Sequence, residues 1–364
     1  MGFNCGIVGL PNVGKSTLFN ALTETAAAEA ANYPFCTIEP NVGRVAVPDE
    51  RLETIARIGQ SAKVIHTQLE FVDIAGLVRG ASRGEGLGNQ FLANIREVDA
   101  ICHVLRCFEG EVTHVEGSID PLRDAETVET ELMLADLDSV ERQRDSTAKK
   151  ARVGEKEAVA RLAVLEPVVA ALQDGKPART VRVSEEQKPI LHGLNLITAK
   201  PVLYVANVEE GSAATGNGLS EKVRAKAEAD GAGFVVISAA IEAEVAQLEA
   251  ADKAEFLETL GLEEPGLARL IRSGYDLLGL LTFFTVGPKE ARAWTVHKGA
   301  RAPQAAGVIH SDFERGFIRA ETIAYADFVA LGGEQACKEA GRMRAEGKDY
   351  LVQDGDIFHF RFNV

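Results

Sequence analysis

Runs of consecutive apolar residues alternate along much of the chain with segments whose apolar residues recur at helical spacing. Five of these runs have the length of buried strands, and they lead into Gly9, Asp73, Phe108, Asn207 and Ser238. Strands that alternate with helices in this way predict an α/β fold class with a doubly wound, mostly parallel sheet. Because ligands of such sheets bind at the carboxyl ends of the strands, we expect the functional residues there.

The middle of the chain changes to two long amphipathic segments. Apolar residues recur at near-helical spacing from Val128 to Val140 and again from Val159 to Leu172, with Gly154 between the two series. This pattern predicts an antiparallel helical hairpin that projects from the sheet domain. Positive charge gathers near the expected tip, at Arg142, Arg144, Lys149, Lys150, Arg152 and Lys156. On an acidic protein this cluster is the best candidate for an RNA contact, and a solvated helix face is the alternative.

The pattern changes again after Leu281. Residues 282–296 are typical of strands and turns, residues 306–316 of a short helix, and the closing run from Phe358 alternates apolar and polar residues after an Asp-Gly turn. We therefore expect a small α+β module without a catalytic constellation, which favours a binding role. The predicted domains are residues 1–126 and 198–280 for the sheet domain, 127–197 for the hairpin and 281–364 for the C-terminal module.

Composition limits the classes of function. At 364 residues the chain fits two or three domains, and it has no apolar run near the ~20 residues of a membrane helix, so no membrane partner is expected. The five cysteines are odd in number and form no C-x-x-C motif, which suits buried thiols in a reducing, cytoplasmic compartment. A net charge of -15 argues against wholesale electrostatic binding to nucleic acid, and no DNA partner is expected.

Residues 9–17 match the pattern G-x-x-x-x-G-K-[ST]. An apolar run precedes the motif and a helical pattern follows it, as in a phosphate-binding loop between a strand and a helix. Backbone N–H groups would close around a polyphosphate, Lys15 would reach the β- and γ-phosphates, and Ser16 would ligate Mg²⁺. A glycine-rich turn with an incidental lysine is the alternative. The loop residues expected to hold the nucleotide are Asn12, Val13, Gly14, Lys15, Ser16 and Thr17.

Two further segments carry candidates for the same site. Asp73 ends a predicted strand and Gly76 follows it, so Asp73 can hold Mg²⁺ through water while the Gly76 N–H senses the γ-phosphate. This makes Gly76 a catalytic candidate together with Lys15. Thr37 lies in an earlier loop and can complete the Mg²⁺ shell, with an ordinary loop threonine as the alternative. The glycine-rich residues 77–91 indicate a loop that a ligand can order, or a flexible linker.

Two positions depart from ordinary switch GTPases. Guanine is normally recognised by N-K-x-D, whereas this chain has Asn207, Val208 and Glu210 at the corresponding places, which compromises the recognition of guanine. Leu77 stands where a switch GTPase has its water-orienting glutamine, and leucine can neither donate nor accept a hydrogen bond. The residue types therefore do not decide which nucleobase is bound or which group orients the attacking water.

Four stretches of the chain together resemble the YchF subfamily of Obg-related P-loop NTPases, the Obg-like ATPases. They are GLPNVGKST, NYPFCTIEPNVG, DIAGLVRGASRGEGLGNQF and NVEE, and the resemblance covers the whole chain. It implies a nucleotide domain, an inserted helical hairpin and a C-terminal TGS-like domain of β-grasp fold. It also implies an ATPase, able to handle GTP as well, that associates with the ribosome, either its large subunit or the 70S particle, in translation or stress responses.

The resemblance also implies which residues meet the base. Phe108 and Val208 would sandwich the purine, and Asn207 would meet the adenine amino group. Glu210 and Ser238 complete the set of residues expected around the base.

For catalysis, the resemblance implies that His114 acts on the attacking water, with a solvated loop histidine as the alternative. Asn12 would support a K⁺ ion, and Arg79 and Arg83 are weaker candidates for the stabilising positive charge. Three other functions stay open: a nucleotide-sensing ribosome- or RNA-binding module with incidental hydrolysis, a GTP-specific Obg-type GTPase, and a metabolic P-loop kinase.

Overall fold

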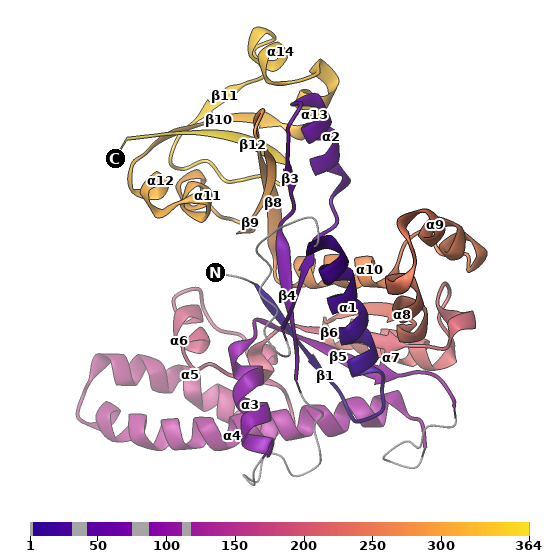
Figure 1. Ribbon diagram of the computed structural model, residues 1–364. Coiled ribbons are helices and arrows are strands. Elements are labelled where there is room, and N and C mark those ends of the chain that lie inside the picture. Colours follow the sequence, from indigo (N-terminus) through magenta and orange to yellow (C-terminus); the bar gives the residue numbers. More distant parts are fainter. Residues whose placement is uncertain (1–2, 31–41, 75–86, 111–117, 364) are drawn as a thin grey trace. The chain divides into compact units, whose positions relative to one another are not determined.

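The computed structural model describes residues 3–30, 42–74, 87–110 and 118–363 (Figure 1). The chain divides into two compact units. The first comprises residues 1–44 and 70–273, and the second comprises residues 45–69 and 274–364. Residues 45–69 thus belong with the C-terminal unit, whereas the sequence analysis placed them in the sheet domain.

The first unit is built on a six-stranded sheet of order β2-β4-β1-β5-β6-β7. Strand β1 pairs in parallel with β4 and β5, and β5, β6 and β7 also pair in parallel. This confirms the predicted mostly parallel α/β sheet. In sheet order its strands are β2 (Val42–Ala46), β4 (Gln68–Asp73), β1 (Asn4–Val8), β5 (Ala100–Arg106), β6 (Val202–Asn207) and β7 (Gly233–Ile237).

The register of the sheet brings the strand ends to one edge. Arg106 at the end of β5 pairs with Asn207 at the end of β6, and Asn207 pairs with Ile237 at the end of β7. Residues that follow these strands therefore emerge as neighbours. The longer helices of this unit besides the hairpin are α1 (Lys15–Ala30), α3 (Leu87–Glu97), α7 (Gly218–Asp230), α8 (Ala239–Gln247) and α9 (Ala250–Thr259), and the boundary between the two units falls within α10 (Gly266–Leu277).

The predicted helical hairpin is present as α4 (Pro121–Arg152) and α5 (Lys156–Gln173), which lie side by side in Figure 1. Helix α4 begins at Pro121, where Asp120 caps it: Oδ1 of Asp120 accepts hydrogen bonds from the N–H groups of Leu122 and Arg123 at 3.2 and 3.3 Å. Gly154 adopts a φ of 83° in the turn between the helices. The seam is apolar and buries Val140, Val164, Leu165, Val168, Val169 and Leu172.

The base of the hairpin is fixed by a buried carboxylate. Asp136 of α4 is fully buried and accepts hydrogen bonds from the N–H groups of Ile197 and Thr198, at 3.1 and 2.8 Å. A terminal guanidinium nitrogen of Arg96 in α3 donates to the same carboxylate at 3.2 Å. Helix α3 and the segment that returns from the hairpin are therefore both tied to α4. Three short helical segments make up this return: η2 (Ala178–Thr180), α6 (Lys188–His192) and η3 (Ile197–Ala199).

The second unit is a six-stranded mixed sheet of order β11-β10-β12-β8-β9-β3. Strands β10 and β12 pair antiparallel, as do β8 and β9, while β12 and β8 run parallel. The strands are β3 (Val64–Ile65), β8 (Leu280–Val286), β9 (Ala291–His297), β10 (Phe317–Ala324), β11 (Arg344–Glu346) and β12 (Asp356–Phe362). The helices are α2 (Glu50–Ile58), α11 (Ala302–Ile309), α12 (Ser311–Arg315), α13 (Tyr325–Leu331) and α14 (Glu334–Glu339).

Residues 45–69 join this unit because they complete its sheet and one of its cores. Strand β3 pairs in parallel with β9, and Leu52 and Ile55 of α2 are fully buried in a cluster with Phe284 and Phe328. No helix in the part of the chain that the structure describes has the length and apolar character needed to cross a membrane.

Candidate functional site

The loop between β1 and α1 has the backbone that its two glycines allow. Gly14 adopts a φ of 97°, and a Cβ built on it would lie 2.3 Å from Nδ2 of Asn207. A Cβ on Gly9 would lie 2.5 Å from the backbone oxygen of Val104 in β5. Both contacts are too short for a side chain, so the spacing of the motif follows from local packing as well as from ligand chemistry.

Lys15 and Asp73 belong to one electrostatic site. Lys15 opens α1 with 7% of its surface exposed, and its Nζ donates to the backbone oxygen of Leu10 at 2.7 Å. Burial lowers the pKa of Lys15 to about 8, and the Asp73 carboxylate partly offsets this shift. Burial also raises the pKa of Asp73, against the opposing effect of Lys15. Ser16 and Thr17 follow Lys15 and are exposed.

Asn207 connects the two halves of the site. It is 3% exposed at the end of β6; its Nδ2 donates to the backbone oxygen of Val13 at 2.9 Å, and its Oδ1 accepts from the N–H of Ala239 at 2.9 Å. One side chain thus ties the Gly9–Thr17 loop to the start of α8. The resemblance places Asn207 at the adenine amino group, and the structure adds this holding role.

The other residues that we expect around the nucleotide base differ in how exposed their side chains are. Phe108 follows β5 and is partly exposed, whereas Val208 is only 2% exposed and its N–H donates to the oxygen of Ile237 at 2.8 Å. Glu210 is exposed at the start of the short helical turn η4 (Glu210–Ser212). Ser238 is 2% exposed, and its Oγ has no hydrogen-bond partner among the described residues. Of the two side chains expected to sandwich a purine, Phe108 offers more accessible surface.

Sequence reasoning missed two residues that shape this edge. Asn217 donates through Nδ2 to the backbone oxygen of Cys107 at 2.6 Å and to Oε2 of Glu209 at 2.9 Å, and it also caps α7. Arg106 is fully buried beneath Phe108. The signals were available: Asn217 and Ser220 form a capping box, and Arg106 interrupts an apolar run.

Of the remaining predicted residues, Asn12 is exposed in the Gly9–Thr17 loop, and six others lie outside the described part of the chain. They are Thr37, Gly76, Leu77, Arg79, Arg83 and His114.

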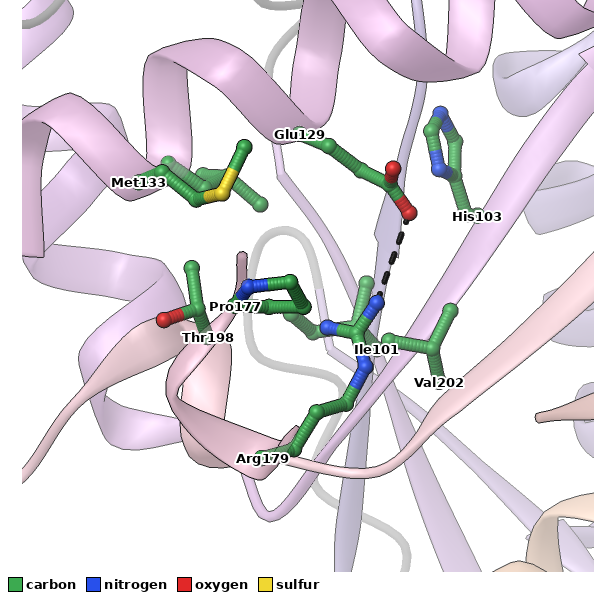
Figure 2. A pocket seen from close by; sticks show the side chains of 9 residues that line it. Ile101, His103, Glu129, Met133, Pro177, Arg179, Thr198 and Val202 are labelled. Atoms are coloured by element: carbon green, nitrogen blue, oxygen red, sulfur yellow. Dashed lines mark hydrogen bonds and ion pairs between the residues drawn. The ribbon is translucent and has the colours of Figure 1, made fainter. Parts of the chain in front are cut away.

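A small cavity lies where the hairpin meets β5 and β6 (Figure 2). Its volume is about 10 Å³, which fits about one water molecule and is too small for a nucleotide. Glu129 of α4 accepts from Nζ of Lys226 at 3.1 Å and from Arg179 at 3.4 Å, and it also bonds Tyr204. Burial lowers the pKa of the neighbouring His103 to about 4, so its imidazole is neutral near pH 7. The cavity thus lies beside the hydrogen bonds of Glu129 that connect the hairpin to the sheet domain.

Comparisons with known proteins agree with this geometry. Residues 4–137 match the family model described as "50S ribosome-binding GTPase", and residues 280–363 match a model named for the C-terminal domain of YchF GTPases and described as a "protein of unknown function". The solved structure of the Schizosaccharomyces pombe YchF GTPase superposes with a TM-score of 0.89 at 38% identity, covering 99% of this chain and 98% of that chain.

Curated relatives match over the full length. Proteins named ribosome-binding ATPase YchF from Haemophilus ducreyi, Escherichia coli O157:H7 and Bacillus subtilis are 59%, 56% and 54% identical, each with 100% of both chains covered. Identity at this level across whole chains, together with the phosphate loop and the strand-edge residues, shows that this chain belongs to the YchF family of P-loop nucleoside triphosphatases.

Proposed function

We propose that this chain is a Mg²⁺-dependent ATPase that binds the ribosome and whose bound nucleotide controls that binding. The observation that carries the proposal is the loop at the end of β1, where desolvated Lys15 and the Asp73 carboxylate share one site at the N terminus of α1. A helix N terminus with a buried lysine favours a polyphosphate. The name of the curated relatives, ribosome-binding ATPase, supports the reaction and the partner.

The residues present fit Mg²⁺. The exposed Ser16 hydroxyl and the half-buried Asp73 carboxylate are oxygen donors, which Mg²⁺ prefers. Ser16 and Asp73 would hold the ion, and Thr37 would complete its shell. When bound, Mg²⁺ neutralises charge that develops on the β- and γ-phosphate oxygens. Lys15, already oriented by its bond to Leu10, adds positive charge on the protein's side of the phosphates.

For the base, we propose ATP in preference to GTP. Val208 is buried and lacks the lysine stem that packs on guanine, and Glu210 lies exposed where the guanine-binding aspartate would stand. A GTPase is the second candidate, because the similar S. pombe structure and the matching family model are both called GTPase. Calorimetric dissociation constants for ATP and GTP with Mg²⁺ decide between them, and GTP binding tenfold tighter than ATP would rule out the ATPase.

For catalysis, we propose that His114 acts on the attacking water, that Gly76 senses the γ-phosphate, and that a K⁺ ion near Asn12 adds a fixed positive charge. Turnover of ATP with and without K⁺ and ribosomes tests this proposal. If neither changes turnover, the alternative of a nucleotide-sensing module with incidental hydrolysis is favoured.

The ribosome contact is proposed at the hairpin tip, with the C-terminal unit as a second binding surface. Two arginines near the tip are already paired, Arg142 with Asp138 at 2.7 Å and Arg144 with Asp145 at 3.1 Å. Within the described residues, no carboxylate lies within 4.0 Å of the cationic groups of Lys149, Lys150 and Arg152. Together with Val153, which is 83% exposed, they offer cationic and apolar surface to an RNA or protein of the ribosome.

A further inference from the structure

The largest fully buried side chain that the structure describes is charged. Arg106 ends β5 with 0% of its surface exposed, in a strand that is otherwise mostly apolar. Burying a guanidinium is costly unless hydrogen bonds compensate the loss of water. A buried arginine at the ligand-binding edge of a sheet therefore calls for an explanation.

Arg106 contacts the turn that follows its strand at both Phe108 and Gly110. Its Nε donates to the backbone oxygen of Phe108 at 3.2 Å, and a terminal nitrogen approaches the backbone oxygen of Gly110 at 3.5 Å. Its guanidinium carbon lies 4.6 Å from the centre of the Phe108 ring. A cation at this distance is attracted to an aromatic face. The same side chain thus supports both the ring and the backbone of Phe108.

We infer that Arg106 is a positioning residue for the nucleotide base. It supports one face of the Phe108 ring, so that the opposite face is held as a ready stacking surface for a purine. This inference rests on the proposed function, in which Phe108 contacts the base, and it adds the residue that holds Phe108 in place. The sheet links Arg106 and Phe108 to the phosphate loop, because Arg106 of β5 pairs with Asn207 of β6, and Asn207 donates a hydrogen bond to the backbone oxygen of Val13. A ring that is already held in place strengthens binding, because less side-chain entropy is lost when the ligand binds.

The test uses the full-length protein with the substitution Arg106→Lys, which keeps the charge and removes the planar guanidinium. Inorganic tripolyphosphate is the second probe because it can occupy a phosphate loop but carries no base. We expect the Kd and KM for ATP to rise about tenfold, the ratio that corresponds to ~1.4 kcal/mol. The kcat and the Kd for tripolyphosphate should stay within about twofold, as expected when only base binding is lost.

The chain offers a matched control. The guanidinium carbon of Arg224 lies 4.8 Å from the centre of the Phe234 ring, away from the phosphate loop, and Arg224→Lys should leave all four quantities unchanged. An equal loss of ATP and tripolyphosphate binding in Arg106→Lys would overturn the inference, because it indicates general damage to the fold.

A double-mutant cycle with Phe108→Ala separates this inference from the proposed function. Phe108→Ala should weaken ATP binding, and adding Arg106→Lys should then cause little further loss. If Phe108→Ala leaves ATP binding unchanged, the proposed base contact fails. If it weakens ATP while Arg106→Lys does not, only the inference fails. Should Arg106→Lys not fold, Arg106→Gln is the second variant, and unchanged ATP affinity in a folded Arg106→Gln protein would overturn the inference.

Discussion

Replacing Asn207 by alanine tests how the phosphate loop is held. The substitution removes a donor from the oxygen of Val13 and an acceptor from the N–H of Ala239, each at 2.9 Å around a side chain that is 3% exposed. A buried backbone group without a partner costs about 1–3 kcal/mol, so the loss is roughly 2–6 kcal/mol before relaxation. The loop would then have to be ordered by the ligand itself.

We expect Asn207→Ala to lower the melting temperature by roughly 4 °C or more. Calorimetry should show the Kd for Mg-ATP and the Kd for tripolyphosphate rising together by about tenfold or more. Both ligands bind the loop through their phosphates, and the variant loop is less well held. The matched control is Asn217→Ala, which removes a helix cap at the same edge without touching Val13. The control should lose stability and keep its tripolyphosphate affinity. A folded Asn207→Ala variant whose two affinities stay within twofold of the wild type would refute the holding role.

Three other predictions follow from the site and the hairpin. Burial holds the pKa of Lys15 near 8, and a bound anionic polyphosphate raises it. Binding at pH 8.5 should therefore take up a proton, and the affinity should fall as the pH rises further. Calorimetry in buffers of different ionisation enthalpy measures both effects. His114→Ala should lower kcat by about 10²- to 10⁴-fold, the usual contribution of a general base, while the nucleotide Kd stays nearly unchanged. Neutralising Lys149, Lys150 and Arg152 to glutamine should weaken cosedimentation with ribosomes and flatten its salt dependence, because fewer phosphates are neutralised.

Each of these three predictions has a contrary outcome. Binding without proton uptake at pH 8.5 would mean that Lys15 is fully charged in the free protein. A parallel loss of affinity and turnover in His114→Ala would make the histidine structural. Unchanged cosedimentation would mean that Lys149, Lys150 and Arg152 are solvated and do not contact the ribosome. The matched hairpin control neutralises Arg142 and Arg144, whose charges already pair with neighbouring carboxylates, and it should have the smaller effect.

The sheet and the phosphate loop could be predicted because their signals are local. Apolar runs specify strands that are buried on both faces, and the spacing of Gly9, Gly14 and Lys15 specifies a phosphate-binding loop between one strand and one helix. The helical hairpin could be predicted for the same reason, because helical periodicity persists over both of its long segments. Asp73 entered the predicted site through its place at the end of a strand, and in the structure it interacts electrostatically with Lys15.

Other features depend on partners that are distant in the sequence. The assignment of residues 45–69 to the C-terminal unit required β3 to meet β9, more than 200 residues further along the chain. Arg106 appeared in the sequence only as an interruption of an apolar run, and its contacts with Phe108 follow from how the turn folds back over the strand end.

By itself, then, the sequence determined the fold class, the family resemblance and the chemistry of the phosphate loop, since these follow from periodicity and from residues within one supersecondary unit. The tertiary structure decided which side chains hold that loop and how the base-side residues are exposed. The reason is physical: Asn207 binds the oxygen of Val13 across 194 residues of chain, and only the parallel register of the sheet brings the two together.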